Sequence, residues 1–236
     1  MESEDKPILE TQVTDTNSPE NRKLGLGLPG AIVIAGIIIA GAIFMNKSSG
    51  FSGDSETDPL DLVSDVTDAD VVRGNEKAPI TIIEYADFSC HFCAQYHPTL
   101  QRIVNESEGR VRWVYRHLPI FNREAAVASS CVARLGNDEL FWKYADMLYV
   151  NTDKFSADFY RAGATELGID GESYDKCLGD PLLGSKIDRE FAQARLLLGF
   201  NATPYTILID KEGRKFSFAG ALPYAELSTA IEGLAK

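Results

Sequence analysis

Two cysteines separated by two residues, Cys90 and Cys93, constrain this chain more than any other feature of its sequence. They follow the mostly apolar run 80–85, which is typical of a strand buried on both faces. They precede residues 94–104, whose apolar side chains recur at helical spacing. At such a strand-to-helix junction the helix dipole and the free backbone N–H groups favour a thiolate, so the pair is typical of a redox site.

The sequence around this junction predicts an α/β domain. Strands are expected at 71–72, 80–85, 111–117, 205–209 and 215–219, and helices directly after Cys93 and from Pro223 onward. Residues 122–198 between them read as a block of helices punctuated by capping residues and glycines, beginning with Asn122 as a cap. The order of these elements indicates one α/β domain with an inserted α-helical subdomain.

The sequence before this domain predicts a membrane anchor. Residues 1–23 are polar without apolar periodicity and are predicted to be a disordered tail. Residues 24–45 carry no charge and are long enough to span a bilayer, which needs about 20 apolar residues. Because Arg22 and Lys23 abut the front of this run, the positive-inside rule places the tail in the cytoplasm and the domain outside. Residues 46–70, rich in Ser, Gly and Asp, are predicted to be a flexible spacer.

Two alternatives compete for the apolar run. A buried core helix is rarely so free of polar residues. A cleaved signal peptide is the stronger alternative, because Ala40-Gly41-Ala42 resembles a cleavage site. The long, acid-rich segment ahead of the run is unlike the short basic start of a signal peptide, and it favours an uncleaved anchor. Both the anchor and the signal peptide export the domain to the periplasmic or extracellular side of the cell membrane.

The acidity of the chain excludes some partners. The formal net charge is −12 and the sequence pI is near 4.7. Nucleic acid and anionic lipid both require basic patches, so the composition argues against either as a partner.

Residues 71–235 resemble the DsbA-type branch of the thioredoxin superfamily. The resemblance rests on the segment YADFSCHFC (85–93), the segment VYRHLP (114–119), the helical block, and Thr203-Pro204 before the last two strands. It implies a thioredoxin-like α/β fold with an inserted α-helical subdomain, here preceded by a single N-terminal transmembrane helix.

The resemblance also implies different roles for the two sulfurs. Cys90 matches the exposed nucleophile, whose reactivity follows its pKa, and Cys93 matches the buried cysteine that resolves the mixed disulfide. Glu84 matches a buried acid that takes the proton of Cys93; its alternative is an outward-facing strand residue. His91, when protonated, would stabilise the Cys90 thiolate, although strongly oxidising relatives have Pro-His where this chain has His91-Phe92.

Thr203-Pro204 matches the cis-proline loop of the superfamily. Such a loop exposes the backbone of Thr203 beside the sulfurs, where an extended client pairs with it as an added strand. From the residues alone, an ordinary trans proline that opens a strand is the alternative. Phe92 is grouped with Thr203 and Pro204 as a predicted substrate-binding residue.

The two remaining cysteines, Cys131 and Cys177, both fall in the helical block. In an exported domain an even number of cysteines favours pairing, so they are predicted to form a structural disulfide. The alternative is a pair of small buried side chains that remain thiols.

No cofactor and no metal site is predicted. Cys90, Cys93 and His97 have a spacing that offers three zinc ligands, but a closed zinc site needs a fourth, and no second ligand cluster is present in the sequence.

The sequence therefore predicts an extracytoplasmic thiol:disulfide oxidoreductase, an oxidase that introduces disulfides into reduced, exported client proteins. The family implies a quinone-linked membrane reoxidase as its second partner, with the membrane itself bound through the chain's own anchor. A disulfide isomerase or reductase is the alternative within the same class, and a metal- or client-binding module without turnover is the alternative from another class.

Overall fold

The computed structural model describes residues 58–198 and 202–234 of the 236-residue chain. The predicted tail (1–23), the predicted anchor (24–45) and the first residues of the predicted spacer lie outside the described residues. In the part of the chain that the structure describes, no helix combines the length and the apolar character needed to cross a membrane.

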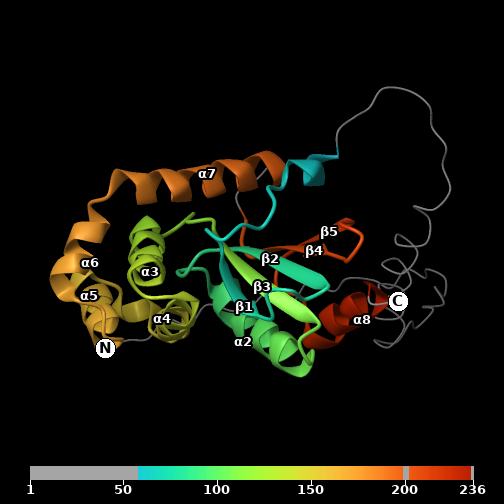
Figure 1. The fold of residues 1–236 in the computed structure, drawn as a ribbon, viewed down its shortest axis with the longest axis horizontal. Coiled ribbons are helices and arrows are strands. Elements are labelled where there is room, and N and C mark those ends of the chain that lie inside the picture. Colours follow the sequence, from blue (N-terminus) through green and yellow to red (C-terminus); the bar gives the residue numbers. More distant parts are fainter. Residues whose placement is uncertain (1–57, 199–201, 235–236) are drawn as a thin grey trace, which may run out of the picture. The chain divides into compact units, whose positions relative to one another are not determined.

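The described residues form an α/β domain (Figure 1). Its strands are β1 (Val71–Gly74), β2 (Ile80–Ala86), β3 (Val111–His117), β4 (Tyr205–Ile209) and β5 (Lys215–Ala219). Its helices are α2 (His91–Glu106), α3 (Arg123–Leu135), α4 (Asp138–Val150), α5 (Ala157–Glu166), α6 (Gly171–Leu178), α7 (Pro181–Leu198) and α8 (Tyr224–Leu234), with short 3-10 turns at η1 (Pro59–Leu62) and η2 (Thr152–Lys154). The order of strands and helices agrees with the sequence prediction.

The sheet has the strand order β1-β3-β2-β4-β5. Strands β2 and β3 are parallel, and the other neighbouring pairs are antiparallel. Every residue of β2 is buried, which agrees with its mostly apolar sequence: the strand lies at the centre of the sheet and is covered on both faces. The cysteine pair follows this central strand, at the start of α2.

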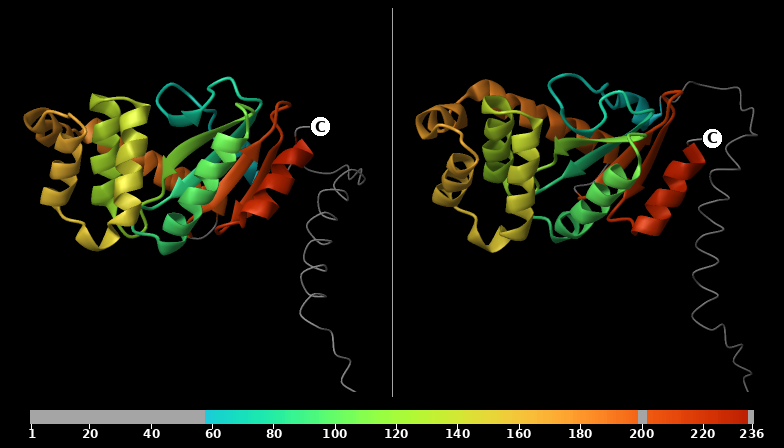
Figure 2. Two further views of the ribbon diagram at one scale, coloured as in Figure 1. Left: turned by 90° about the horizontal axis from the view of Figure 1, so that it is seen from below. Right: turned by 60° about the horizontal axis from the view of Figure 1, so that its bottom comes forward.

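Helices cover the two faces of the sheet (Figure 2). On one face α2 and α8 contribute buried side chains such as Leu100 and Leu227 to a core that includes Trp113 of β3. On the other face Ala194 of α7 packs with Ile83 of β2 in a smaller core. Strand β2 is therefore held between two apolar layers.

The helical block between β3 and β4 consists of α3 to α7. Two of its helices begin at side-chain caps: the side chain of Asn122, the predicted cap, accepts a hydrogen bond from Ala125 N, and that of Ser156 accepts one from Phe159 N. Pro98 lies inside α2, which continues through it to Glu106. The prediction of an inserted α-helical subdomain is confirmed.

The structure differs from the predicted spacer over residues 58–70. Val63 is 3% exposed and packs in the core beneath α7, and Lys215 Nζ donates to the carbonyls of Leu60 and Val63 at 3.0 and 3.1 Å. Asp70 forms a buried ion pair with Arg116 of β3, with 3.0 Å between Oδ1 and Nε. These few buried residues do not stand out in so acidic a segment, which is why it was predicted to be a spacer. Residues 58–70 are part of the domain.

Candidate functional site

The loop between β2 and α2 is held by Asp87, which is 2% exposed. Its Oδ1 accepts from Ser89 N at 2.7 Å, and its backbone carbonyl accepts from Cys90 N at 3.0 Å. Its Oδ2 accepts from Phe121 N at 2.5 Å, which ties this loop to the loop after β3. Asp87 thereby fixes the point at which the chain turns from the central strand into the helix that carries the sulfurs.

Cys90 is the N-cap residue of α2 and, like Cys93, is present as a thiol. The pKa of the Cys90 thiol is lowered to about 6, first because the Cys93 thiol hydrogen-bonds to it. The Thr203 side chain and the backbone N–H groups of the first helical turn lower it further, while burial opposes the shift. A thiol with a pKa of 6 is about 90% ionised at pH 7. The predicted thiolate at a helix start thus has its physical cause in hydrogen bonds.

The predicted exposure of Cys90 is wrong. Its side chain is 5% exposed, and in the thiol form Sγ donates to the carbonyl of Thr203 at 3.3 Å. The reason is the loop that carries Thr203, which closes over the sulfur from a part of the sequence more than a hundred residues away.

Cys93 has the opposite environment. It is 0% exposed, and burial raises the pKa of its thiol far above the usual range. The hydrogen bond to Cys90 and the charge of Glu84 raise it further. One sulfur is therefore prepared as a thiolate, and the other as a thiol that must lose a proton before it can attack.

Glu84 lies on β2 and is 0% exposed, so the alternative of an outward-facing strand residue is excluded. Burial raises the pKa of its carboxyl to about 8, with the Cys90 thiolate adding to the shift and the Trp113 indole opposing it. Neither carboxyl oxygen meets hydrogen-bonding geometry with a partner among the described residues. A buried carboxyl that titrates near neutral pH suits transfer of a proton to or from Cys93.

The Thr203–Pro204 peptide bond is cis, as the resemblance implied. Pro204 is buried, Thr203 is half-buried, and the Thr203 carbonyl faces the Cys90 sulfur. The structure thus brings together Cys90, Cys93, Glu84, Thr203 and Pro204.

The two residues between the cysteines are exposed. His91 is exposed, with Nε2 2.9 Å from Nε2 of Gln95, and it is not among the main groups that lower the pKa of Cys90. Phe92 is 60% exposed and presents its ring to solvent beside the nucleophile.

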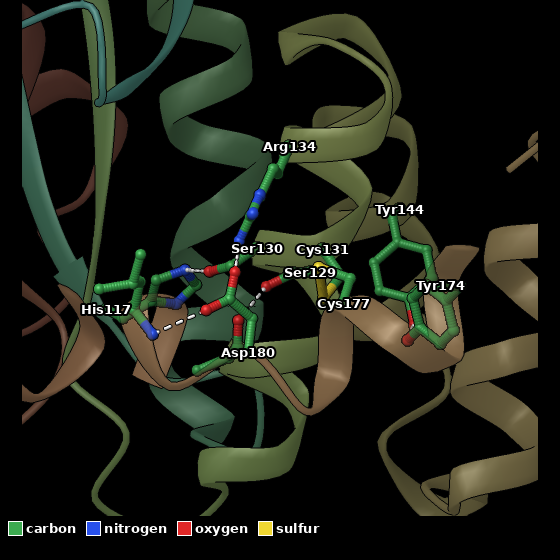
Figure 3. Close-up of a disulfide and its surroundings, with 11 residues drawn as sticks. His117, Ser129, Ser130, Cys131, Arg134, Tyr144, Tyr174, Cys177 and Asp180 are labelled. Atoms are coloured by element: carbon green, nitrogen blue, oxygen red, sulfur yellow. Dashed lines mark hydrogen bonds and ion pairs between the residues drawn. A yellow bond between two sulfur atoms is a disulfide. The ribbon is translucent and has the colours of Figure 1, made fainter. Parts of the chain in front are cut away.

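The second cysteine pair lies in the helical subdomain (Figure 3). Cys131 of α3 and Cys177 of α6 form a disulfide, with their Cα atoms 5.8 Å apart. Both residues are buried, and an ion pair between Arg134 and Asp180 lies near the bond. His117 is buried too, with Nε2 2.9 Å from Ser130 Oγ.

His97 is buried in the core and does not join the cysteines. Its Nε2 lies 2.7 Å from Oδ1 of Asp146 on α4. Within residues 58–198 and 202–234, no three His, Cys, Asp or Glu side chains are placed to hold a metal ion together. No local sequence pattern pointed to Asp146 or to the hydrogen bond between Asp87 and Phe121, since both contacts depend on how distant segments meet.

Comparisons with known proteins agree with this geometry. A family model described as thioredoxin matches residues 66–233. DsbA2 of Pseudomonas aeruginosa has a similar structure, with 28% identity, a TM-score of 0.60, and coverage of 72% of this chain and 97% of that one. Alpha-DsbA1 of Wolbachia pipientis shares the fold with a TM-score of 0.64 at 21% identity, covering 75% of this chain and 96% of that one.

The chain belongs to the thioredoxin family. Within that family it is a thiol:disulfide oxidoreductase of the DsbA type.

Curated relatives include an Na(+)/H(+) antiporter NhaA of Herminiimonas arsenicoxydans, 30% identical over 146 residues that cover 62% of this chain and 23% of the antiporter. The antiporter NhaA 3 of Salinispora tropica is 33% identical over 144 residues, which cover 58% of this chain and 21% of the antiporter. The chain thus spans less than a quarter of the length of these relatives.

Proposed function

We propose that this oxidoreductase works as a disulfide oxidase through Cys90 and Cys93. The observation that carries the proposal is the position of Cys90 at the start of α2, where hydrogen bonds lower its pKa to about 6. Stabilising the thiolate stabilises the reduced protein, so its disulfide tends to pass to other thiols. A stabilised thiolate also leaves readily when a mixed disulfide is resolved.

The reaction balances in electrons and protons. A client thiolate attacks Cys90 Sγ of the oxidised protein, the Cys90–Cys93 bond breaks, and Cys93 leaves as a thiolate that takes a proton from Glu84. A second client thiolate then attacks the client sulfur of the mixed disulfide. The client disulfide forms and Cys90 departs as its stabilised thiolate. The client is oxidised by two electrons and the Cys90–Cys93 pair is reduced by two.

The clients of such an oxidase are reduced proteins outside the cytoplasm, and a quinone-linked membrane reoxidase restores the cysteine pair. The Cys131–Cys177 disulfide supports an extracytoplasmic location, because disulfides persist in oxidising compartments. The backbone of Thr203 would pair with an extended client segment, with the exposed Phe92 ring beside it.

The test is the equilibrium of the full-length chain with defined ratios of reduced to oxidised glutathione, together with the pH dependence of Cys90 thiolate absorbance. An oxidase is expected to have a reduction potential well above the thioredoxin value of about −270 mV, and a thiolate absorbance that titrates near pH 6. A potential near the thioredoxin value would indicate a reductase instead. Zinc retained in stoichiometric amount, with no thiol exchange, would indicate a metal-binding module.

A further inference from the structure

A cavity of about 200 Å³ lies between α2 and α4. Its wall includes Ala94, directly after Cys93, together with His97, Asp146 and Tyr149. The ring of His97 is buried, and its Nδ1 meets no hydrogen-bond partner among the described residues, while its Nε2 is paired with Asp146. The side chain of Asp146 is 43% exposed. The cavity therefore holds an acid–base pair that reaches solvent and has no role in the exchange chemistry above.

One residue that lines this cavity, Tyr149, is hydrogen-bonded to a second buried tyrosine. Tyr149 lines the cavity, and its hydroxyl lies 3.2 Å from that of Tyr115, both buried. Tyr115 of β3 is the register partner of Glu84 on the parallel strand β2, so the two side chains are neighbours on one face of the sheet. Burial raises the pKa of both tyrosines, and the charges of Glu84 and Cys93 raise it further.

Other groups around Glu84 do not lead to the cavity. The Trp113 indole has only an N–H and cannot accept a proton. The Tyr96 hydroxyl accepts a hydrogen bond from Thr206 of β4, on the opposite side of β2 from β3. On the cavity side, two more groups contact the carboxyl of Asp146. Gln101 Nε2 donates a hydrogen bond to it, and the guanidinium of Arg73 lies 3.7 Å from it.

We propose that the Tyr115–Tyr149 hydroxyl pair carries the proton of Glu84 to and from the His97–Asp146 cavity. The proposal rests on the function proposed above. When Cys93 closes on Cys90, its proton passes to Glu84, the Cys90–Cys93 bond forms, and the bond from Cys90 to the other sulfur breaks to release a thiolate. Glu84 then returns its proton through the two hydroxyls. A water bridges each end of the pair, because neither Glu84 nor the His97–Asp146 pair is hydrogen-bonded to these hydroxyls. Each hydroxyl accepts one proton and donates another, so neither ends charged, and the two tyrosines act as positioning residues.

The test uses the reduced full-length chain and 5,5′-dithiobis(2-nitrobenzoate). The first thionitrobenzoate is released when Cys90 attacks, and the second when Cys93 displaces it from Cys90. Tyr149→Phe and Tyr115→Phe are each expected to slow the second release by about fivefold or more at pH 7 and to increase its solvent deuterium isotope effect. The first release should keep its rate, because it does not require Glu84.

Tyr144→Phe is the matched control. It also removes a buried tyrosine hydroxyl, one that donates to the carbonyl of Tyr160 within the helical subdomain. It should leave both releases and the isotope effect unchanged, whatever it does to thermal stability. If either tyrosine variant of the proton route fails to fold, Asp146→Asn at the exposed end of the cavity serves instead, with the same expected slowing.

Two outcomes separate this inference from the function on which it rests. If Glu84→Gln slows the second release while Tyr115→Phe, Tyr149→Phe and Asp146→Asn all keep the wild-type rate and isotope effect, the proton route is overturned and the oxidoreductase assignment stands. If the wild-type chain releases no second thionitrobenzoate, the proposed chemistry of Cys90 and Cys93 is itself wrong.

Discussion

The two cysteine pairs of this protein are both buried, yet their surroundings are opposite. Cys90 and Cys93 stand at the start of a helix, where backbone N–H groups, the Thr203 loop and a buried carboxyl all act on the sulfurs. Cys131 and Cys177 are separated by 46 residues and join two helices of the subdomain in a disulfide. Burial alone therefore does not make a cysteine inert: reactivity depends on whether neighbouring groups stabilise one thiolate over the other.

The largest change is expected from removal of the nucleophile of the reactive pair. Cys90→Ser is expected to reduce thiol exchange by at least about a thousandfold, because a serine hydroxyl is not ionised at neutral pH and cannot form a disulfide. The helical subdomain should keep its structure. Exchange with a small disulfide and far-ultraviolet circular dichroism measure the two effects. A variant that lost its fold together with its activity would mean that Cys90 has a structural role.

The opposite result is expected for the second pair. Replacing both Cys131 and Cys177 by Ala should lower the free energy of unfolding by about 2–4 kcal/mol, since the disulfide closes a long loop. Exchange at Cys90 should change by less than about twofold, because the second pair lies on α3 and α6, outside the reacting loop. Denaturant unfolding and exchange kinetics on the same samples provide the measurement. A large loss of exchange in a folded variant would show that the two pairs are coupled.

Much of the surroundings of the two cysteine pairs could be predicted from the sequence. The apolar pattern of β2, the helix after Cys93 and the capping residues of the subdomain were sufficient to place both pairs, since these signals are local. The burial of Cys90 was missed because it depends on the Thr203 loop, and the His97–Asp146 pair was missed because its members are 49 residues apart. Contacts of this kind have no local sequence pattern. Residues 58–70 were missed because a single buried Val63 in an acidic segment gives no periodicity.

The third prediction concerns Glu84, the buried carboxyl that acts on the Cys90–Cys93 pair and has no counterpart in the argument for Cys131 and Cys177. Glu84→Gln is expected to slow closure of Cys93 on Cys90 by about ten- to a hundredfold near pH 7, because the proton acceptor is lost. Attack by Cys90 on an external disulfide should be much less affected. The two-phase release of thionitrobenzoate measures both steps, and equal slowing of both phases would contradict a specific action on Cys93.

The same substitution gives a pH test of stability. The pKa of Glu84 is raised from 4.5 to about 8 in the folded protein, so the folded state binds this proton more tightly than the unfolded state. The stabilisation is complete below the unfolded pKa and is lost as pH rises towards 8, with a limiting slope of about 1 kcal/mol per pH unit. Urea unfolding of the wild type and Glu84→Gln across this range should show a difference that grows with pH in favour of Gln. A difference that does not vary with pH would mean that Glu84 does not titrate in this window.

The last prediction concerns two exposed apolar side chains, one near each cysteine pair. Phe92 is 60% exposed between the reactive cysteines, and Leu182 is 75% exposed on α7, close in sequence to Cys177. Exposed side chains of this kind contribute little to folding, so Phe92→Ala and Leu182→Ala should both leave stability within about 0.5 kcal/mol of the wild type. If Phe92 contacts the client, Phe92→Ala should weaken the reaction with a reduced protein client by about three- to tenfold, since burying one aromatic ring in an interface contributes of order 1 kcal/mol. Its reaction with glutathione should be unchanged, because so small a thiol gains little from the ring. Leu182→Ala should alter neither reaction, and equal behaviour of the two variants towards the protein client would remove Phe92 from the binding surface.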